Sequence, residues 1–187
     1  MPNAVLEAIH ARRSIRQYQP KEIKEADLKA VLEAGMYAPS AVNQQRWHFT
    51  VVQDKATLER LVGVIKENIL SSGNKFLGER AKAPDYHTFY HAPTVVIISG
   101  DKDAFALQID CGCAAENMLI AAEGLGLGSC LMTSPGLLFS GARGAEIKKE
   151  LGIPEGYAHV CTVTLGYRAG EPPPTPPRNP DVVNYLK

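Results

Sequence analysis

The residues with the clearest chemical potential lie near the start of the chain, in the run Arg12-Arg13-Ser14-Ile15-Arg16. Three guanidinium groups and one hydroxyl group within five residues can donate several hydrogen bonds to the oxygens of one phosphate group. A basic cluster of this size is also common as a solvated surface patch. The run therefore indicates a local phosphate-binding site, with a surface patch as the alternative interpretation.

The overall charge indicates whether nucleic acid or a lipid membrane is an expected partner. The chain has 20 basic and 20 acidic residues and a formal net charge of +0, so it lacks the basic surface typical of proteins that bind nucleic acid or anionic lipid. No apolar run approaches the roughly 20 residues that a membrane-spanning helix needs. The N-terminal residues MPNAVLEAIHARR predict an amphipathic helix rather than a signal peptide. We expect a cytoplasmic protein with no nucleic-acid or membrane partner.

Motifs for other kinds of site are missing from the sequence. No G-x-G-x-x-G motif follows a predicted strand and no P-loop occurs, while the glycine-rich run 124–129 follows a helix and predicts a tight turn. The cysteines lack zinc-site spacing, which favours small buried thiols. No histidine has a cysteine or carboxylate neighbour at ligand spacing in the sequence, so we expect no metal site. The four cysteines are Cys111, Cys113, Cys130 and Cys161.

Helical and strand patterns interleave along the whole chain. Helices are predicted at Ala4–Arg12, Glu25–Tyr37, from the cap Asp54 to about Ile69, Ala104–Glu123 and Ala145–Leu151. Strands are predicted at His48–Gln53, Thr94–Ser99, Ser129–Met132 and His159–Leu165. With only four strands and two helices before the first of them, the pattern predicts one compact α+β domain of three layers over residues 1–187.

The helix predicted at Ala104–Glu123 is apolar on most of its faces. Such a helix must be buried nearly all round, either at the centre of the domain or across a subunit interface.

Two segments lack a regular pattern. Residues 71–91 predict a loop or lid, in which Tyr86, His87 and Phe89 could stack against a planar electron acceptor. Residues 170–187 begin with the proline-rich run GEPPPTPPR and predict an extended C-terminal arm.

Five segments, taken in their order and spacing, resemble the FMN-dependent nitroreductase family over essentially the whole chain. They are RRSIRQY at 12–18, APSAVNQQRWHF at 38–49, HAPTVVIIS at 91–99, GLGLGSCLM at 124–132 and the proline-rich tail that ends in Arg178. The resemblance implies an α+β fold with a central mixed or antiparallel sheet flanked by helices. It also implies an intertwined homodimer with each FMN bound between the two chains.

The resemblance assigns the first run to the cofactor. Arg12, Arg13 and Ser14 would hold the FMN phosphate, as would Arg178 at the end of the stiff proline-rich arm. Arg16 matches a basic residue directed at the N1 and O2 edge of the flavin. A fixed cation there would stabilise the negative charge that two-electron reduction places on that edge.

Two further segments would contact the flavin ring. Pro39, Ser40, Asn43 and Gln45 belong to a P-S-x-x-N-x-Q segment expected at the ring edge, where an amide can both donate and accept hydrogen bonds. This chain has Arg46 where the family usually has proline, which leaves the local turn open. Trp47, which follows it, is expected to pack in the core.

The backbone of the glycine-rich strand would pass over one face of the ring. The residues expected there are Leu131, Met132 and Thr133.

By the same resemblance, NADH or NADPH would pass a hydride to flavin N5 and leave. A nitroaromatic, quinone or similar small planar acceptor would then take two electrons in the same cleft. A reductive dehalogenase or another specialised flavoenzyme of this fold stays open as an alternative, as does a non-catalytic FMN-binding or redox-sensing module. The chemistry belongs to the cofactor, so no acid-base dyad is required.

Overall fold

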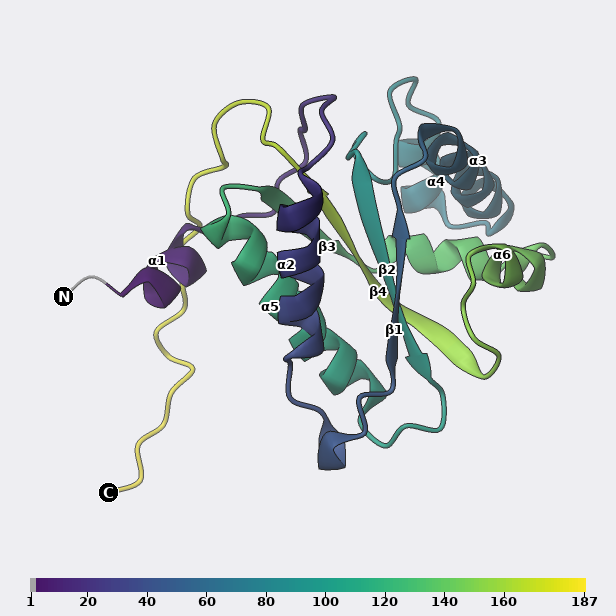
Figure 1. Ribbon diagram of the computed structural model, residues 1–187. Helices are drawn as coiled ribbons and strands as arrows, with labels where there is room; N and C mark the ends of the chain where they lie inside the picture. Colours follow the sequence, from purple (N-terminus) through teal and green to yellow (C-terminus); the bar gives the residue numbers. More distant parts are fainter. Residues whose placement is uncertain (1–2) are drawn as a thin grey trace.

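The structure of the protein, a computed structural model, describes residues 3–187 and has three layers (Figure 1). A four-stranded sheet lies between one layer formed by α2 and α5 and another formed by α3 and α6. The strands are β1 (Trp47–Val52), β2 (Thr94–Asp101), β3 (Gly128–Met132) and β4 (Tyr157–Gly166), in the spatial order β1-β2-β4-β3. All neighbouring strands are antiparallel. The predicted α+β three-layer fold and its four strands are confirmed.

The helices match the sequence pattern closely, apart from one addition. They are α1 (Ala4–Ala11), α2 (Glu25–Met36), α3 (Lys55–Ser71), α4 (Lys75–Ala81), α5 (Leu107–Gly124) and α6 (Gly144–Glu150), with 3₁₀ turns η1 (Ala41–Asn43) and η2 (Ser134–Phe139). The side chain of Asp54 accepts a hydrogen bond from the backbone N–H of Thr57 at 2.7 Å, which confirms the predicted cap of α3.

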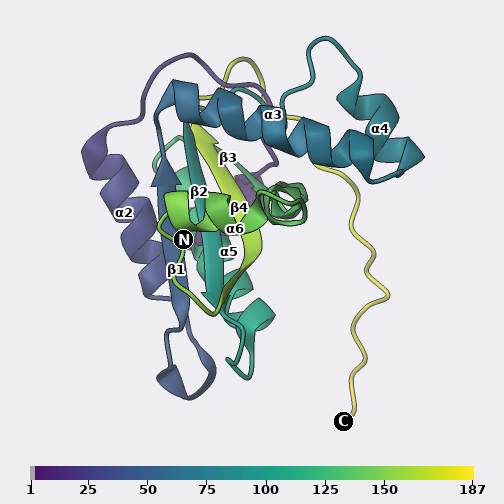
Figure 2. The ribbon, with the colours of Figure 1, turned by 90° about the vertical axis from the view of Figure 1, so that its right-hand side faces the viewer.

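The added helix, α4, lies inside the segment that we predicted as a loop. Asn74 caps it by accepting a hydrogen bond from the Leu77 N–H at 3.0 Å. Gly78 lies at the centre of this seven-residue helix, and glycine is a poor helix former, so the sequence pattern did not predict a helix here. In Figure 2, α3 and α4 form a helical hairpin that reaches beyond the sheet.

Strand β2 shows why the sheet needs helices on both sides. Val96 and Ile98 belong to the core beneath α2 and α5, whereas Val95 and Ile97 belong to the core beneath α3 and α6. All four side chains are fully buried. Successive strand residues point to opposite faces, so a continuous apolar run requires cover on both.

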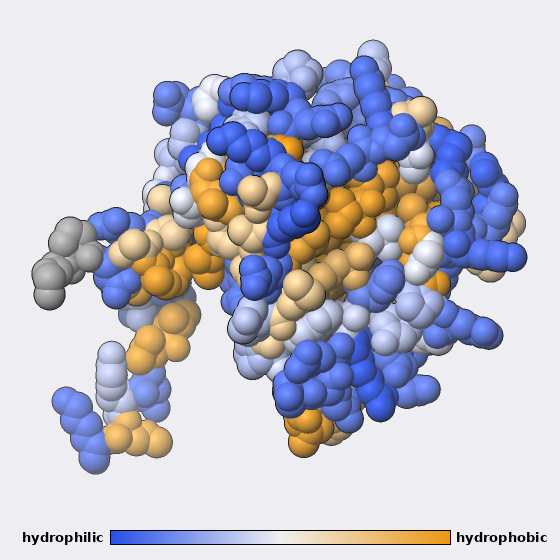
Figure 3. Space-filling view, in the orientation of Figure 1, coloured by the Kyte–Doolittle hydropathy of each residue, from blue (hydrophilic) through white to orange (hydrophobic). Residues whose placement is uncertain are grey.

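Helix α5 is buried on one side only within a single chain, so its predicted burial nearly all round would need a subunit interface. Cys111 and Met118 on one side are buried, whereas Ile109 on the other side is 69% exposed. Helix α1, which packs on α5, buries none of its residues, and its apolar side chains are visible at the left edge of Figure 3. One chain therefore leaves the apolar surface of α1 and α5 uncovered.

The C-terminal arm is exposed throughout residues 171–187 and runs away from the body of the chain (Figure 2). Within residues 3–187, no helix combines the length and apolarity needed to cross a membrane.

The pH dependence of stability should report on His159. Burial, with a smaller contribution from Lys148, lowers the pKa of this histidine to about 4, whereas an unfolded histidine titrates near pH ~6.5. As the pH falls below ~6.5, the unfolded chain binds this proton before the folded chain does. The contribution of His159 to the free energy of unfolding is therefore complete above that pH and is lost on acidification toward 4. Between pH 7 and pH 5, the free energy of unfolding should therefore fall by about 2 kcal/mol less in His159→Gln than in the parent protein, as measured by urea unfolding. His10→Gln on exposed α1 is the control, and equal losses in the parent and His159→Gln would contradict the assignment.

Candidate functional site

The chain after α1 docks along the edge of the sheet. Ser14 pairs with Ser129 of β3 as an isolated parallel bridge, in which the Ile15 N–H donates to the Ser129 carbonyl at 2.8 Å. Farther on, the Gln19 N–H donates to the carbonyl of Tyr167, just after β4, at 2.9 Å. Residues 14–19 therefore lie in a fixed position against two strands.

Tyr18 holds this segment from inside the domain. Its buried hydroxyl group donates to the Ile15 carbonyl at 2.8 Å and shares a hydrogen bond of 2.8 Å with the hydroxyl group of Thr164 on β4. Burial raises the pKa of Tyr18, so the phenol stays protonated and acts as a structural group.

The predicted phosphate and flavin residues lie at the edge of β3 and beside α5. Ser14 is held against Ser129 of β3, and Ser14 and Arg16 line the same small cavity. Arg12 pairs with Glu116 of α5, with 3.5 Å between Nε and Oε1. Burial raises the pKa of the Cys130 thiol on β3, and the charges of Arg16 and Arg12 and the Ser14 side chain oppose that rise.

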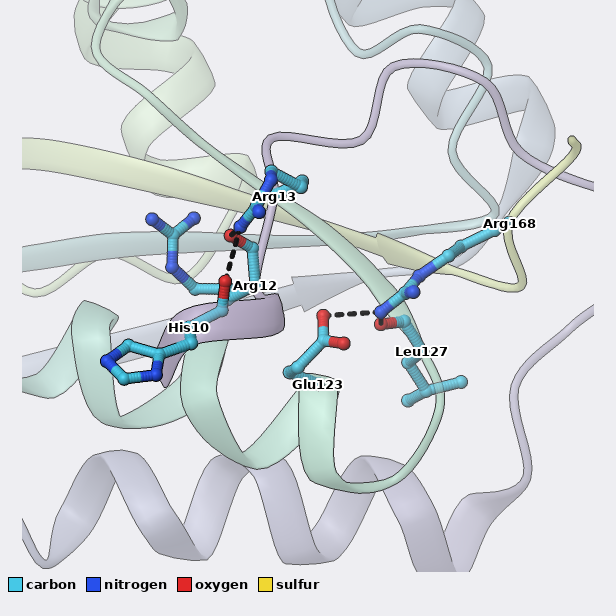
Figure 4. A network of polar contacts seen from close by, with 6 residues as sticks. All are labelled: His10, Arg12, Arg13, Glu123, Leu127 and Arg168. Carbon is cyan, nitrogen blue, oxygen red and sulfur yellow. Dashed lines mark hydrogen bonds and ion pairs between the residues drawn. The ribbon is translucent and has the colours of Figure 1, made fainter. Parts of the chain in front are cut away.

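Arg13 is turned toward the backbone. Its Nη1 donates to the carbonyls of His10 and Arg12, both at 2.7 Å, at the end of α1 (Figure 4). Its Nε is buried and has no hydrogen-bond partner within residues 3–187. In this arrangement Arg13 closes α1 and presents less of its guanidinium group to a ligand than Arg12 does.

Arg16 lines two cavities. One, of about 270 Å³, is also lined by Ser14, Arg168 and Gly170. The other, of about 540 Å³, is lined by Arg16, Tyr90 and Ser134 together with part of the 71–91 segment. The Arg16 guanidinium carbon lies 5.8 Å from the centre of the Tyr90 ring.

The 71–91 segment contributes two of its three predicted substrate residues to the larger cavity. Tyr86 and His87 line it, as does Arg80 of α4. Phe89 is fully buried in the core beneath α3, so its predicted contact with an acceptor is corrected to a packing role.

His87 also corrects the expectation that no histidine has a carboxylate partner. Its Nε2 lies 3.6 Å from Oε1 of Glu59, and its Nδ1 accepts the His91 N–H at 3.1 Å. Burial and His91 lower the pKa of His87, while Glu59 opposes this change. Because Nδ1 accepts a hydrogen bond, the neutral ring carries its proton on Nε2, which faces Glu59. The possible ligand atoms of Glu59, His87 and His91 all lie within 4.8 Å of one another, a grouping that the sequence spacing did not predict.

The turn at 39–46 forms a second part of the predicted site. The Ser40 hydroxyl group accepts the Gln45 N–H at 3.0 Å, and the Gln45 side chain donates to Oδ1 of Asn43 at 2.7 Å. Asn43 and Gln45 both have positive φ angles, a strained conformation that these bonds help to hold. Arg46, which replaces the usual proline, anchors the turn through an ion pair of 3.1 Å with Asp101. Pro39, Asn43 and Gln45 are exposed.

The two parts of the site lie at different levels of α5. The turn attaches near the start of the helix, where Oδ1 of Asp110 accepts the Ala41 N–H at 3.0 Å, whereas Arg12 pairs with Glu116. Six residues of helix separate these anchors by about 9 Å. Among the described residues of one chain, no hydrogen bond or ion pair joins the turn to the arginine segment.

The remaining predicted residues are placed as follows. Leu131 and Thr133 are exposed beside β3, while Met132 is buried. Arg178 lies on the exposed arm, where its Nη1 donates to the Pro176 carbonyl at 3.2 Å. Trp47 packs against the core near Phe49, as expected.

Comparison with known proteins identifies the family. The sequence model of the nitroreductase family matches residues 9–167. The chain belongs to the nitroreductase family. A relative from Methanothermobacter thermautotrophicus, which carries the provisional name NADH dehydrogenase/NAD(P)H nitroreductase, is 32% identical over 98% of this chain and 87% of its own.

Solved structures of nitroreductases share the fold. A nitroreductase with bound FMN from Bacteroides fragilis NCTC 9343 is 38% identical, with a TM-score of 0.94 over all of both chains. A nitroreductase with bound FMN from Desulfitobacterium hafniense DCB-2 is 29% identical, with a TM-score of 0.89, again over all of both chains. The structure thus confirms the architecture that the sequence motifs implied.

Sequence reasoning missed several residues that line the cavities of this nitroreductase-family chain. Arg168 and Tyr90 were not predicted, nor were Ser134 and Arg80 as cavity residues. None of them lies in a recognisable motif. The available signal for Arg168 was its place directly after the last predicted strand, where strand ends often carry binding residues.

Gly128 controls how closely the arginine segment approaches β3. A Cβ at this position would lie 2.9 Å from Cγ2 of buried Ile15 and 3.0 Å from Cγ of Arg168. Gly128→Ala should therefore lift the segment from the sheet, destabilise the protein by about 1–3 kcal/mol in urea unfolding and reduce hydrogen-exchange protection of the Ile15 amide. Gly63→Ala in α3 is the control, because its Cβ meets no atom within 4 Å and should be neutral or stabilising. Unchanged stability with a protected Ile15 amide in Gly128→Ala would show that the segment does not depend on this contact.

Proposed function

We propose that this chain is an FMN-dependent NAD(P)H oxidoreductase that reduces nitroaromatic, quinone or similar small electron-poor acceptors. The observation that carries the proposal is that Arg16 lines both cavities, with Ser14 beside it in the smaller one. Both of the similar solved structures described above contain bound FMN. The relative from Methanothermobacter supports NADH or NADPH as the electron donor through its name.

The residues present fit FMN in their donor chemistry. The smaller cavity offers the Ser14 hydroxyl group and cationic side chains, which suit phosphate oxygens. The larger cavity offers the aromatic rings of Tyr86 and Tyr90, which suit a planar group. An elongated ligand with a phosphate in the smaller cavity and a flat ring in the larger one would run past Arg16, which lines both cavities.

The chemistry that FMN supplies when bound is two-electron transfer from NADH or NADPH to the acceptor. The chain contributes placement and charge. Arg16 puts a fixed cation where negative charge would develop, and Tyr18 keeps its backbone from moving. The lid segment, which includes α4, forms the outer wall of the larger cavity and would limit the entry of water and of large acceptors.

The proposed site requires a second copy of the chain. The turn at 39–46 and the arginine segment lie apart within one chain, and α1 and α5 leave an apolar surface uncovered. A two-fold contact through that surface would bury apolar area and could bring the turn of one chain to the arginine segment of the other. We therefore propose a homodimer with a flavin at each of two shared sites.

The proposal predicts a colour change that residues of the arginine segment control. FMN-loaded protein should lose the yellow absorbance of oxidised flavin when NADH or NADPH is added without oxygen, and nitrofurazone should restore it. Arg12→Ala combined with Ser14→Ala should raise the Kd for FMN by about 100-fold or more, because two hydrogen bonds to a charged group are lost. Arg143→Ala with Ser140→Ala, which removes an exposed arginine and an exposed serine that line neither cavity, is the matched control.

The other outcomes distinguish the rival functions. Flavin that stays oxidised would favour a binding or sensing module, and restoration of colour by iodotyrosine but not by nitrofurazone would favour a dehalogenase. A protein that takes up no FMN would contradict the proposal as a whole.

A further inference from the structure

Arg168 occupies a fixed position at the end of β4. The backbone on either side of it pairs with the docked N-terminal segment: the Ala169 N–H donates to the Gln17 carbonyl at 3.0 Å. The Gln19 side chain donates to the Arg168 carbonyl at 2.8 Å. The base of the Arg168 side chain therefore keeps its place relative to Ser14 and Arg16.

The guanidinium group of Arg168 is only partly used. Its Nη2 pairs with the carboxylate of Glu123 at the end of α5 and also donates to the Leu127 carbonyl at 3.3 Å (Figure 4). Its Nε is buried without a hydrogen-bond partner, and its Nη1 makes no hydrogen bond to any described residue. Since a guanidinium group carries five N–H donors, most of its capacity is left for something else.

Arg168 also lines the smaller cavity, together with Ser14 and Arg16. The cavity wall includes one acidic residue, Glu171, which is exposed. Two arginine residues and a serine residue thus line a space of about 270 Å³, and their side chains carry donors that suit a small anion such as a phosphate monoester.

We infer that Arg168 is a further residue for binding the phosphate of the cofactor, with Glu123 holding its guanidinium group in place. The inference rests on the proposed function, and it differs from the motif-based assignment, which gave this role near the C-terminus to Arg178. Arg178 lies ten residues farther along an exposed arm that must be ordered before it can bind. Arg168 is already ordered by the sheet and so loses less conformational entropy on binding.

The alternative is a purely structural role. The alkyl stem of Arg168 packs against Gly128, and its pair with Glu123 joins β4 to α5. A structural role would support every flavin equally, whereas a phosphate contact supports only a flavin that carries a phosphate. Riboflavin, which is FMN without the phosphate, separates the two roles.

The test is to measure the Kd for FMN and for riboflavin by fluorescence titration of the full-length apoprotein. Arg168→Gln, which keeps much of the alkyl stem, and Arg168→Ala should each raise the Kd for FMN by about 10- to 100-fold, as expected for loss of a hydrogen bond between charged groups. The Kd for riboflavin should change by less than about two-fold, since the lost contact is to phosphate alone. Arg60→Ala, which breaks the remote pair of Arg60 with Glu150, should change neither value.

The outcomes separate this inference from the proposed function. Equal weakening of both flavins in Arg168→Gln, or an unchanged preference for FMN over riboflavin, would overturn the inference while leaving the proposed function intact. A parent protein that binds neither flavin would instead overturn the proposed function. Should Arg168→Ala fail to fold, the ratio of the two Kd values in Arg168→Gln still decides the question.

Discussion

Burial of the central strands on both faces is the constraint on which the rest of the molecule depends. Val95 and Ile97 of β2 face one core, and Val96 and Ile98 face the other, so helices must cover the sheet on both sides. The faces are then closed to ligands, and polar chemistry is confined to strand edges and strand ends. The N-terminal segment uses the edge of β3, and Arg168 extends from the end of β4.

This constraint explains why so few residues form the candidate site. Hydrogen bonds from Ile15 and Gln19 to the sheet fix a short stretch of chain, in which Ile15 is buried and Gln17 lines the cavities. Tyr18 points inward, whereas Arg16 points outward. The site is thus rigid where the phosphate and the negative edge of a flavin would lie, and it borders the lid segment only where an acceptor would enter.

The sequence predicted the elements whose signals are local. The β-branched run of β2 and the cap at Asp54 each encode their structure within a few residues. Helix α4 has a glycine at its centre, and the pairing of Glu59 with His87 joins residues 28 apart, so neither had a clear local signal. Phe89 shows the opposite difficulty, because an aromatic residue in an irregular segment looks like a binding residue until its burial is known.

The motifs predicted which residues belong to the candidate site, but not how these residues lie relative to one another. The motifs implied Arg12, Ser14 and Arg16, which the fold holds along the edge of β3 and beside Glu116 of α5, and equally the turn at 39–46, which attaches near the start of α5. Ile109 and the apolar face of α1 are exposed, and an uncovered apolar surface is typical of a protein interface. A second chain bound at this surface would supply the other part of the flavin site. The central claim is therefore that each flavin site is shared between two chains.

Subunit complementation tests this claim most directly. One chain would carry Arg12→Ala and Ser14→Ala, the other Ser40→Ala and Asn43→Ala, and heterodimers would be purified through two different affinity tags after co-expression. Each homodimer should bind little FMN, whereas the heterodimer should regain one intact site and bind about one FMN per two chains, because a C₂ dimer has two equivalent sites. Heterodimers that bind no more FMN than the two parent homodimers would contradict a site shared between chains.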